Sequence, residues 1–265
     1  MTTLQIIVLA IFQGLTEFLP ISSSGHLVLV PAFAGWTDQG LMFDVAVHLG
    51  SLVAVGVYFR SDIAGLVRGG FSILRGEHRT RDAQMALAIA IGTVPAAVAG
   101  LAFAGWIEEN LRHPSVVVVT LSLFGILMAL SDIFSRRERT IADITLKDAL
   151  IVGLAQALAL VPGTSRSGIT ITAGRILGFK RYDAARFSFL LSAPVILLAG
   201  CYKILSLLLD GVSIAWQELG LGVLVSAIVA YLSIEFFMRF VNRIGLLPFA
   251  IYRLLLAGVI VYVLL

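Results

Sequence analysis

The stretch MALAIAIGTVPAAVAGLAFAGWI, from Met85 to Ile107, contains no charged residue. Apolar runs of about 18 or more residues with few charges are typical of helices that span a membrane. The rest of the chain has the same character, since 59% of its 265 residues are hydrophobic and only 13% are charged, whereas a soluble domain carries about 25% charged residues. The composition therefore predicts an integral membrane protein that crosses the bilayer several times.

Six uninterrupted apolar segments are predicted to span the membrane. Lys and Arg are favoured in cytoplasmic loops, and arginine-rich stretches follow the first, third and fifth of these segments. The spans then alternate in direction without contradiction, and both termini fall on the external side. The net charge of +3 suits such loops and gives no reason to expect a nucleic-acid partner. The predicted spans are residues 41–59, 85–107, 115–134, 187–209, 218–238 and 245–265.

Two further apolar regions, about 4–35 and 148–178, are each broken in the middle by Gly, Pro and Ser. Irregular backbone at membrane depth is tolerated only where protein or a water-filled cavity surrounds it. Both regions are therefore predicted to be re-entrant helical hairpins, which enter and leave the membrane on the same side.

The two broken regions resemble each other. Gln13 to Gly25 reads QGLTEFLPISSSG and Gln156 to Gly168 reads QALALVPGTSRSG, with the same Gln, Leu and final Ser-x-Ser-Gly. We therefore expect an all-α polytopic fold, a single membrane domain over 1–265, built from two repeats at 1–140 and 141–265. Each repeat has one hairpin and three transmembrane helices, and this odd number of spans predicts that the halves are inverted. Inverted repeats with broken helices are typical of transporters, with the site at the repeat interface.

The second broken segment carries residues expected to bind a phosphate. Two hydroxyls flank the guanidinium of Arg166, whose planar fork of donors matches phosphate oxygens. A helix that begins near Ser167 would add free N–H groups for an anion. The alternative is an ordinary serine helix cap, but a cap needs one hydroxyl and no arginine. The predicted phosphate-binding residues here are Gly163, Ser165, Ser167, Gly168 and Thr170, with Arg166 as the clamp.

The first broken segment adds hydroxyls and an imidazole. Ser22, Ser23 and Ser24 are further candidates for phosphate binding. His26 follows Ser23 by three residues, a spacing that can place imidazole beside hydroxyl on one helical face, and a serine nucleophile needs an adjacent base. The alternative for His26 is a buried structural histidine. Ionisable residues at membrane depth are costly and usually functional, which favours the site.

Gln13 and Glu17 are predicted to form a metal site. They are four residues apart, so they lie on the same face of a helix. A carboxylate and an amide oxygen together suit Mg²⁺ or Ca²⁺, because both ions prefer oxygen ligands.

Four other ionisable residues lie within the predicted spans, namely Asp44, His48, Glu235 and Arg253. For these residues we expect structural roles, such as a buried pair between Asp44 and Arg253 that satisfies both charges.

The two motifs resemble those of the undecaprenyl-diphosphate phosphatase family, also known as the bacitracin resistance proteins. The first is Glu-or-Gln, three residues, then Glu-Phe-Leu-Pro-x-Ser-Ser-x-Gly-His, here Gln13 to His26, and the second is Pro-Gly-x-Ser-Arg-Ser-x-x-Thr, here Pro162 to Thr170. The ending Pro248-Phe-Ala-Ile-Tyr-Arg253 is also similar, so the resemblance covers essentially the whole chain. It implies removal of the terminal phosphate from undecaprenyl diphosphate, which recycles the lipid carrier of cell-wall synthesis.

By this resemblance the catalytic set is Glu17, Ser23, His26 and Arg166. Ser23 is our candidate nucleophile, with His26 as its base or as proton donor to the leaving lipid phosphate; attack by water or by His26 stays open. Many family members have Glu where this chain has Gln13, so its metal site has one carboxylate fewer.

The resemblance implies a polyprenyl diphosphate substrate, with its tail among the membrane spans, and a bacterial inner (plasma) membrane location with the site open to the external (periplasmic) side. A homodimer is compatible with the sequence. The competing class is a polyprenyl-phosphate transporter or flippase that uses the same inverted-repeat site. A transporter that binds an anion needs no nucleophile and base, which favours the enzyme.

Overall fold

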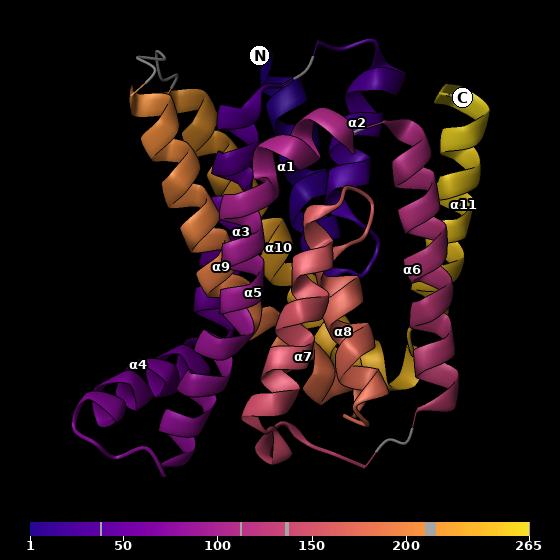
Figure 1. Cartoon of the computed structure of the whole chain (residues 1–265). Helices are drawn as coiled ribbons and strands as arrows, with labels where there is room; N and C mark the ends of the chain where they lie inside the picture. Colours follow the sequence, from indigo (N-terminus) through magenta and orange to yellow (C-terminus); the bar gives the residue numbers. More distant parts are fainter. Residues whose placement is uncertain (38, 112, 136–137, 210–215, 265) are drawn as a thin grey trace.

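The structure is a computed structural model that describes residues 1–37, 39–111, 113–135, 138–209 and 216–264. Long helices run side by side through most of the molecule, and both termini lie at the same end of the bundle (Figure 1). The prediction of an all-α polytopic membrane protein is confirmed. In chain order the helices are α1 (Thr3–Phe18), α2 (Ser23–Ala34), α3 (Leu41–Tyr58), α4 (Arg60–Leu74), α5 (Arg81–Asn110), α6 (Pro114–Phe134), the 3-10 turn η1 (Ile141–Asp143), α7 (Leu146–Ala157), the 3-10 turn η2 (Leu158–Leu160), α8 (Arg166–Ile176), α9 (Arg181–Leu209), α10 (Trp216–Ile244) and α11 (Leu247–Leu264).

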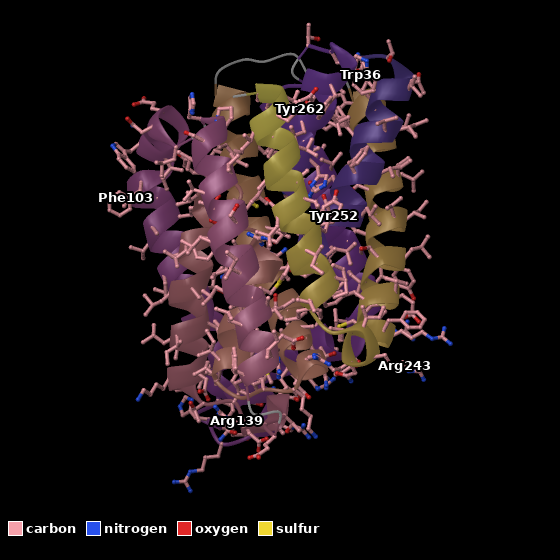
Figure 2. All side chains as sticks on the ribbon, turned by 90° about the vertical axis from the view of Figure 1, so that its right-hand side faces the viewer. Trp36, Phe103, Arg139, Arg243, Tyr252 and Tyr262 are labelled. Carbon is pink, nitrogen blue, oxygen red and sulfur yellow. The ribbon has the colours of Figure 1, made fainter. Side chains whose placement is uncertain are left out.

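Within these ranges, five helices are long and apolar enough to cross a membrane: α5, α6, α9, α10 and α11. A sixth span results if the bent pair α3–α4 counts as one. Many large apolar side chains on these helices are exposed, for example Leu101 at 77% and Phe134 at 78%, as expected for helices whose outer faces contact lipid. Figure 2 places Arg139 and Arg243 at the end of the bundle opposite Trp36 and Tyr262.

Helix α4 was not predicted, because its charged residues read as a loop. It meets α3 at an angle of 87°, at the buried residue Phe59. Its Gly69 lies so close to α5 that a Cβ there would approach the carbonyl oxygen of Asp82 to 2.2 Å. Arg68 Nε also donates to Asp82 Oδ2 at 3.1 Å. Close packing on α5 therefore fixes this amphipathic helix outside the main bundle.

The two broken regions form helical hairpins, and their re-entrant course in a membrane stays a prediction. Helices α1 and α2 are joined by a short turn at Pro20, while α7, η2 and α8 form the second hairpin around Pro162. The first hairpin enters from the end of the bundle that holds both termini and the second from the opposite end (Figure 1). The relation of the two halves as an inverted repeat over 1–140 and 141–265 stays a prediction.

An ion-pair cluster anchors the lower end of α8. Asp132 of α6 accepts from Arg175 Nε at 3.2 Å and from Arg181 Nε at 2.7 Å. It also accepts from the backbone N–H of Leu246 at 3.0 Å. Because Arg175 is completely buried, its charge needs this partner. The cluster thus ties α6, α8, α9 and α11 together and fixes the direction of α8.

Candidate functional site

The two hairpins contact each other at their broken ends. Arg166 Nη2, at the start of α8, donates to Glu17 Oε1 of α1 at 2.7 Å. Beside this ion pair, Ser167 Oγ donates to the carbonyl oxygen of Leu19 at 3.2 Å. The motifs predicted to cooperate are therefore brought together, although they are far apart in the chain.

Glu17 is the centre of this cluster. Its second oxygen, Oε2, accepts from Ser23 Oγ at 2.8 Å and from Gln13 Nε2 at 3.0 Å. His48 Nε2 of α3 lies 3.5 Å from the same oxygen. Glu17 is buried, and a buried carboxylate is stable only with such partners. The carboxylate thus accepts a hydrogen bond from the Ser23 hydroxyl while its charge is balanced by Arg166.

The amide of Gln13 has one free acceptor. Its Nε2 donates to Glu17, but Oε1 is buried and has no hydrogen-bond donor among the described residues. In the described part of the chain, no three His, Cys, Asp or Glu side chains are grouped so as to hold a metal ion. The metal site predicted at Gln13 and Glu17 stays a prediction.

The loop before α8 has the geometry of an anion site. Ser165 is the N-cap of α8, and its Oγ accepts from the backbone N–H of Gly168 at 3.2 Å. Helix α8 begins at Arg166, one residue before the predicted start, so free N–H groups and the positive end of the helix dipole face the loop. The cap interpretation is therefore also right for Ser165, but it accounts for only one hydroxyl.

Backbone strain shapes this loop. Ser165 has φ 67° and Gly163 has φ 85°, in the left-handed region that non-glycine residues rarely occupy. A Cβ on Gly163 would lie 2.3 Å from Thr120 Oγ1, so only glycine fits. In the first hairpin, Ser22 has φ 75°. Such strain in both hairpin turns is typical of functional sites.

Thr170, predicted to bind phosphate, has hydrogen-bond partners away from the loop. Its Oγ1 is 2.6 Å from Ser188 Oγ of α9 and donates to the carbonyl oxygen of Arg166 at 2.7 Å. Ser22 is buried, whereas the side chain of Ser24 lies outside the described residues. The role of each serine and of Thr170 in phosphate binding stays a prediction.

The hydrogen-bond partners of His26 are Ser22 and Tyr252. Its Nδ1 lies 2.8 Å from the carbonyl oxygen of Ser22, so Nδ1 carries a proton, because a carbonyl only accepts. Its Nε2 lies 2.6 Å from the hydroxyl of Tyr252 on α11. Among the described residues no hydrogen bond joins Ser23 to His26, so the expected pairing of hydroxyl with imidazole is not formed here.

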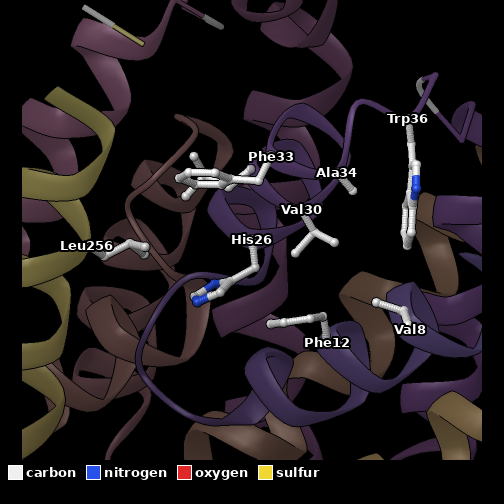
Figure 3. Close-up of a pocket in the computed structure, with 9 residues that line it drawn as sticks. Val8, Phe12, His26, Val30, Phe33, Ala34, Trp36 and Leu256 are labelled. Atoms are coloured by element: carbon white, nitrogen blue, oxygen red, sulfur yellow. The ribbon is translucent and has the colours of Figure 1, made fainter. Parts of the chain in front are cut away.

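The imidazole also lines an apolar pocket of about 440 Å³. Figure 3 shows His26 among apolar side chains from α1, α2 and α11, with Phe12 and Leu256 nearest to it in the view. The rings of His26 and Tyr252 are stacked, with an interplanar angle of 9° and centroids 5.7 Å apart. The pocket thus has a mainly apolar lining, with the His26 imidazole as a polar group in it.

Sequence reasoning missed two residues of this cluster, His48 and Tyr252, and it assigned Arg253 to the wrong partner. Arg253 donates to backbone carbonyl oxygens rather than to Asp44, which accepts from Gln39 at 2.8 Å. Contacts between side chains on helices far apart in the sequence cannot be predicted from the spacing of residues within one helix. The resemblance of the segment ending in Tyr252 and Arg253 to the family was the one sign that these residues belong near the site.

The fold and this cluster define a class of multi-pass helical membrane proteins in which two broken hairpins join a carboxylate to the strained loop before α8. The model of the family "Bacitracin resistance protein BacA" matches residues 6–259. The chain belongs to this family. It is 53% identical to undecaprenyl-diphosphatase 2 of Stutzerimonas stutzeri, over 98% of this chain and 97% of that protein. It is also 53% identical to an undecaprenyl-diphosphatase of Hahella chejuensis, over 99% of this chain and 98% of the relative.

Proposed function

We propose that this membrane protein is a phosphatase that hydrolyses the terminal phosphate of undecaprenyl diphosphate. The products are undecaprenyl phosphate and inorganic phosphate, so the reaction recycles the lipid carrier of cell-wall synthesis. The names of full-length relatives support this reaction. The observation that carries it is the contact of Glu17 with both Arg166 at 2.7 Å and Ser23 at 2.8 Å, which sets a hydroxyl and its base beside the anion-binding loop.

In this mechanism, the diphosphate binds against Arg166 and the first turn of α8. Phosphoryl transfer needs mainly positioning and neutralisation of charge on the phosphate oxygens. Ser23 Oγ attacks the terminal phosphorus, its proton passes to Glu17 Oε2, and the bond from phosphorus to the bridging oxygen breaks. Undecaprenyl phosphate leaves, and water then hydrolyses the phosphoserine to release inorganic phosphate.

The sequence left two roles open for His26, base for Ser23 or proton donor to the leaving lipid phosphate, and this scheme uses the second. Because Glu17 already contacts Ser23, Glu17 is the base for the nucleophile. His26 would instead act in its imidazolium form, with Nδ1–H held by the Ser22 carbonyl and a second proton, taken up from water, on Nε2. Nε2, with the Tyr252 hydroxyl 2.6 Å away, would pass this second proton to the leaving lipid phosphate. The apolar pocket beside the imidazole would hold the first prenyl units of the tail.

A divalent cation, Mg²⁺ or Ca²⁺, fits the oxygens at Gln13 and Glu17. The unpartnered, buried Oε1 of Gln13 is an acceptor that a cation would satisfy, and the Glu17 carboxylate supplies the charge. Such an ion would neutralise phosphate oxygens. Gln13→Glu should raise the affinity for Ca²⁺, read as a larger rise in melting temperature with added Ca²⁺ than in the wild type. An equal rise in both proteins would argue against these ligands.

The proposed cellular location rests on membership of the same family. We propose the bacterial plasma membrane, with the site opening to the external side, and a homodimer stays a prediction. In this orientation the end of the bundle with Arg139 and Arg243 (Figure 2) faces the cytoplasm, in agreement with the preference of Lys and Arg for that side.

The deciding experiment is single-turnover phosphate release from a C55 or C15 prenyl diphosphate by purified protein in detergent. Wild type should release phosphate, and Ser23→Ala should abolish release but still bind the lipid, because the loop before α8 is intact. Ser61→Ala, at an exposed hydroxyl of α4, is the matched control. A Ser23→Ala rate above about a tenth of wild type, a loss of only about 1.4 kcal/mol, would make water or His26 the nucleophile. No release by the wild type would favour a transporter or flippase.

A further inference from the structure

Arg253 on α11 is completely buried and ties the anion-binding loop to two helices. Its Nη2 donates to the carbonyl oxygen of Gly163 at 3.1 Å and to that of Thr120 at 3.3 Å. Its Nε donates to the carbonyl oxygen of Leu121 at 3.2 Å. One guanidinium thus holds the loop between α6 and α11.

The charge of Arg253 has no carboxylate partner among the described residues. Two other arginines near the loop and α8 differ in this respect, because Arg166 pairs with Glu17 and Arg175 pairs with Asp132. A guanidinium stays charged in a protein, and an unpaired buried charge at membrane depth is costly and usually functional. Neutral hydrogen-bond donors would be enough to hold the loop in place, so the positive charge of the Arg253 guanidinium needs a second explanation.

The unsatisfied part of the guanidinium lies against the first turn of α8. Nη1 is buried and has no hydrogen-bond partner among the described residues. A Cβ built on Gly168 would lie 2.8 Å from Nη1, so the nitrogen lies directly beside the helix backbone. Thr164 Oγ1, in the same loop, is also buried without a partner. The positive charge therefore adds to the positive end of the α8 dipole.

We propose that Arg253 is a second cationic residue of the anion site, which attracts the diphosphate by its charge and positions the Gly163 carbonyl by its hydrogen bonds. This inference rests on the proposed function. Arg166 and Glu17 cancel each other's charge in this structure, so Arg253 supplies net positive charge at the loop before substrate arrives. Arg253 acts on the substrate through the position of the loop and through its electrostatic field, without touching the reacting atoms. It is therefore a positioning residue.

The expected size of the effect follows from Coulomb's law. A unit charge about 8 Å from one anionic charge, at an effective dielectric constant of about 20, changes affinity on the order of thirtyfold. A role limited to packing would change the stability of the loop without distinguishing charged from neutral replacements. The two roles are therefore separable by the charge of the replacing residue.

The test measures binding of inorganic pyrophosphate to the purified full-length protein in detergent, without divalent cations, together with its melting temperature. The variants are Arg253→Gln, which removes the charge, and Arg253→Lys, which keeps it but cannot reproduce the fork. Thr120→Val is the matched control, because it removes a neutral anchor of the same loop, the bond from Thr120 Oγ1 to the carbonyl oxygen of Pro162 at 2.6 Å.

We expect Arg253→Gln to weaken pyrophosphate binding by about tenfold or more. Arg253→Lys should stay within about threefold of wild type, and Thr120→Val, which loosens the loop but keeps the charge, should lose clearly less affinity than Arg253→Gln even if its melting temperature falls. Equal affinities of Arg253→Gln and Thr120→Val would overturn the proposal. If Arg253→Gln does not fold, Arg253→Lys decides alone, since a tenfold loss in a folded Lys variant would show that charge is not what matters. Absence of phosphate release from prenyl diphosphate by wild type would contradict the proposed function and leave these binding results valid.

Discussion

Glu17 and Arg166 form an ion pair that joins the two hairpins, and replacing them singly and together tests whether that pair holds the site. The atoms Glu17 Oε1 and Arg166 Nη2 are 2.7 Å apart, with side chains only 8% and 12% exposed. Glu17→Gln and Arg166→Gln each leave the opposite charge buried without its partner. Removing one member of a buried pair typically costs about 3–5 kcal/mol, so each variant should lose about 3 kcal/mol of unfolding free energy.

The double variant separates the pair from its surroundings. With both charges removed, neither residue leaves an unpaired ion, so the double variant should be about 3 kcal/mol more stable than the sum of the single losses predicts. The remaining hydrogen bonds of Glu17 with Ser23 and Gln13 can be retained by an amide oxygen. Stability is measured by unfolding in mixed micelles of mild detergent and dodecyl sulfate.

Activity should behave differently from stability in this series. Glu17→Gln removes the base for Ser23, which should lower phosphate release by about a hundredfold or more. The double variant should remain inactive although its stability is partly restored, because it lacks both the Glu17 carboxylate that acts as base and the Arg166 guanidinium that binds phosphate. Two results would refute the reasoning: single losses of stability that add within about 0.5 kcal/mol, or a double variant that regains activity.

Three further predictions test other parts of the molecule. Tyr252→Phe should lower turnover by up to about tenfold, the value of one hydrogen bond, whereas Tyr262→Phe at an exposed position of the same helix should not; equal activities would contradict this. Asp132→Ala should lower the unfolding free energy by about 3–5 kcal/mol, because it leaves its two arginine partners without a carboxylate, and an unchanged unfolding midpoint would argue against the cluster. In a background without the native cysteine, a cysteine at Arg75 should not react with an impermeant thiol reagent outside intact cells, whereas one at Asn110 should, and the reverse would invert the topology.

The fold was largely predictable because the bilayer imposes simple rules on the sequence. A run without charges, such as Met85–Ile107, has few alternatives to a spanning helix, and the broken motifs at Pro20 and Pro162 indicated where the helices are interrupted. The amphipathic helix α4 was missed, since it is stabilised by packing on α5 and not by its own apolar character. Local composition carries no information about such a partner.

The site was predictable only where its residues are close in sequence or share a motif. Glu17 and Arg166 were predicted to act together because they occupy matching broken motifs. The direction of the His26 ring was not predictable, because its partner Tyr252 lies on α11, and the helical spacing from Ser23 suggested the wrong neighbour. His48 was missed for the same reason, as its contact with Glu17 depends on how α3 packs beside α1.

The pairing of Glu17 with Arg166 also bears on how a charged site can exist inside a membrane. Each ion is costly when alone at this depth, and together they are stable. The proposed substrate carries its own negative charge, so it competes with Glu17 for the Arg166 guanidinium. When a phosphate takes over Arg166, Glu17 loses this cationic partner and becomes a better base for Ser23. Binding of the diphosphate would thus activate the base.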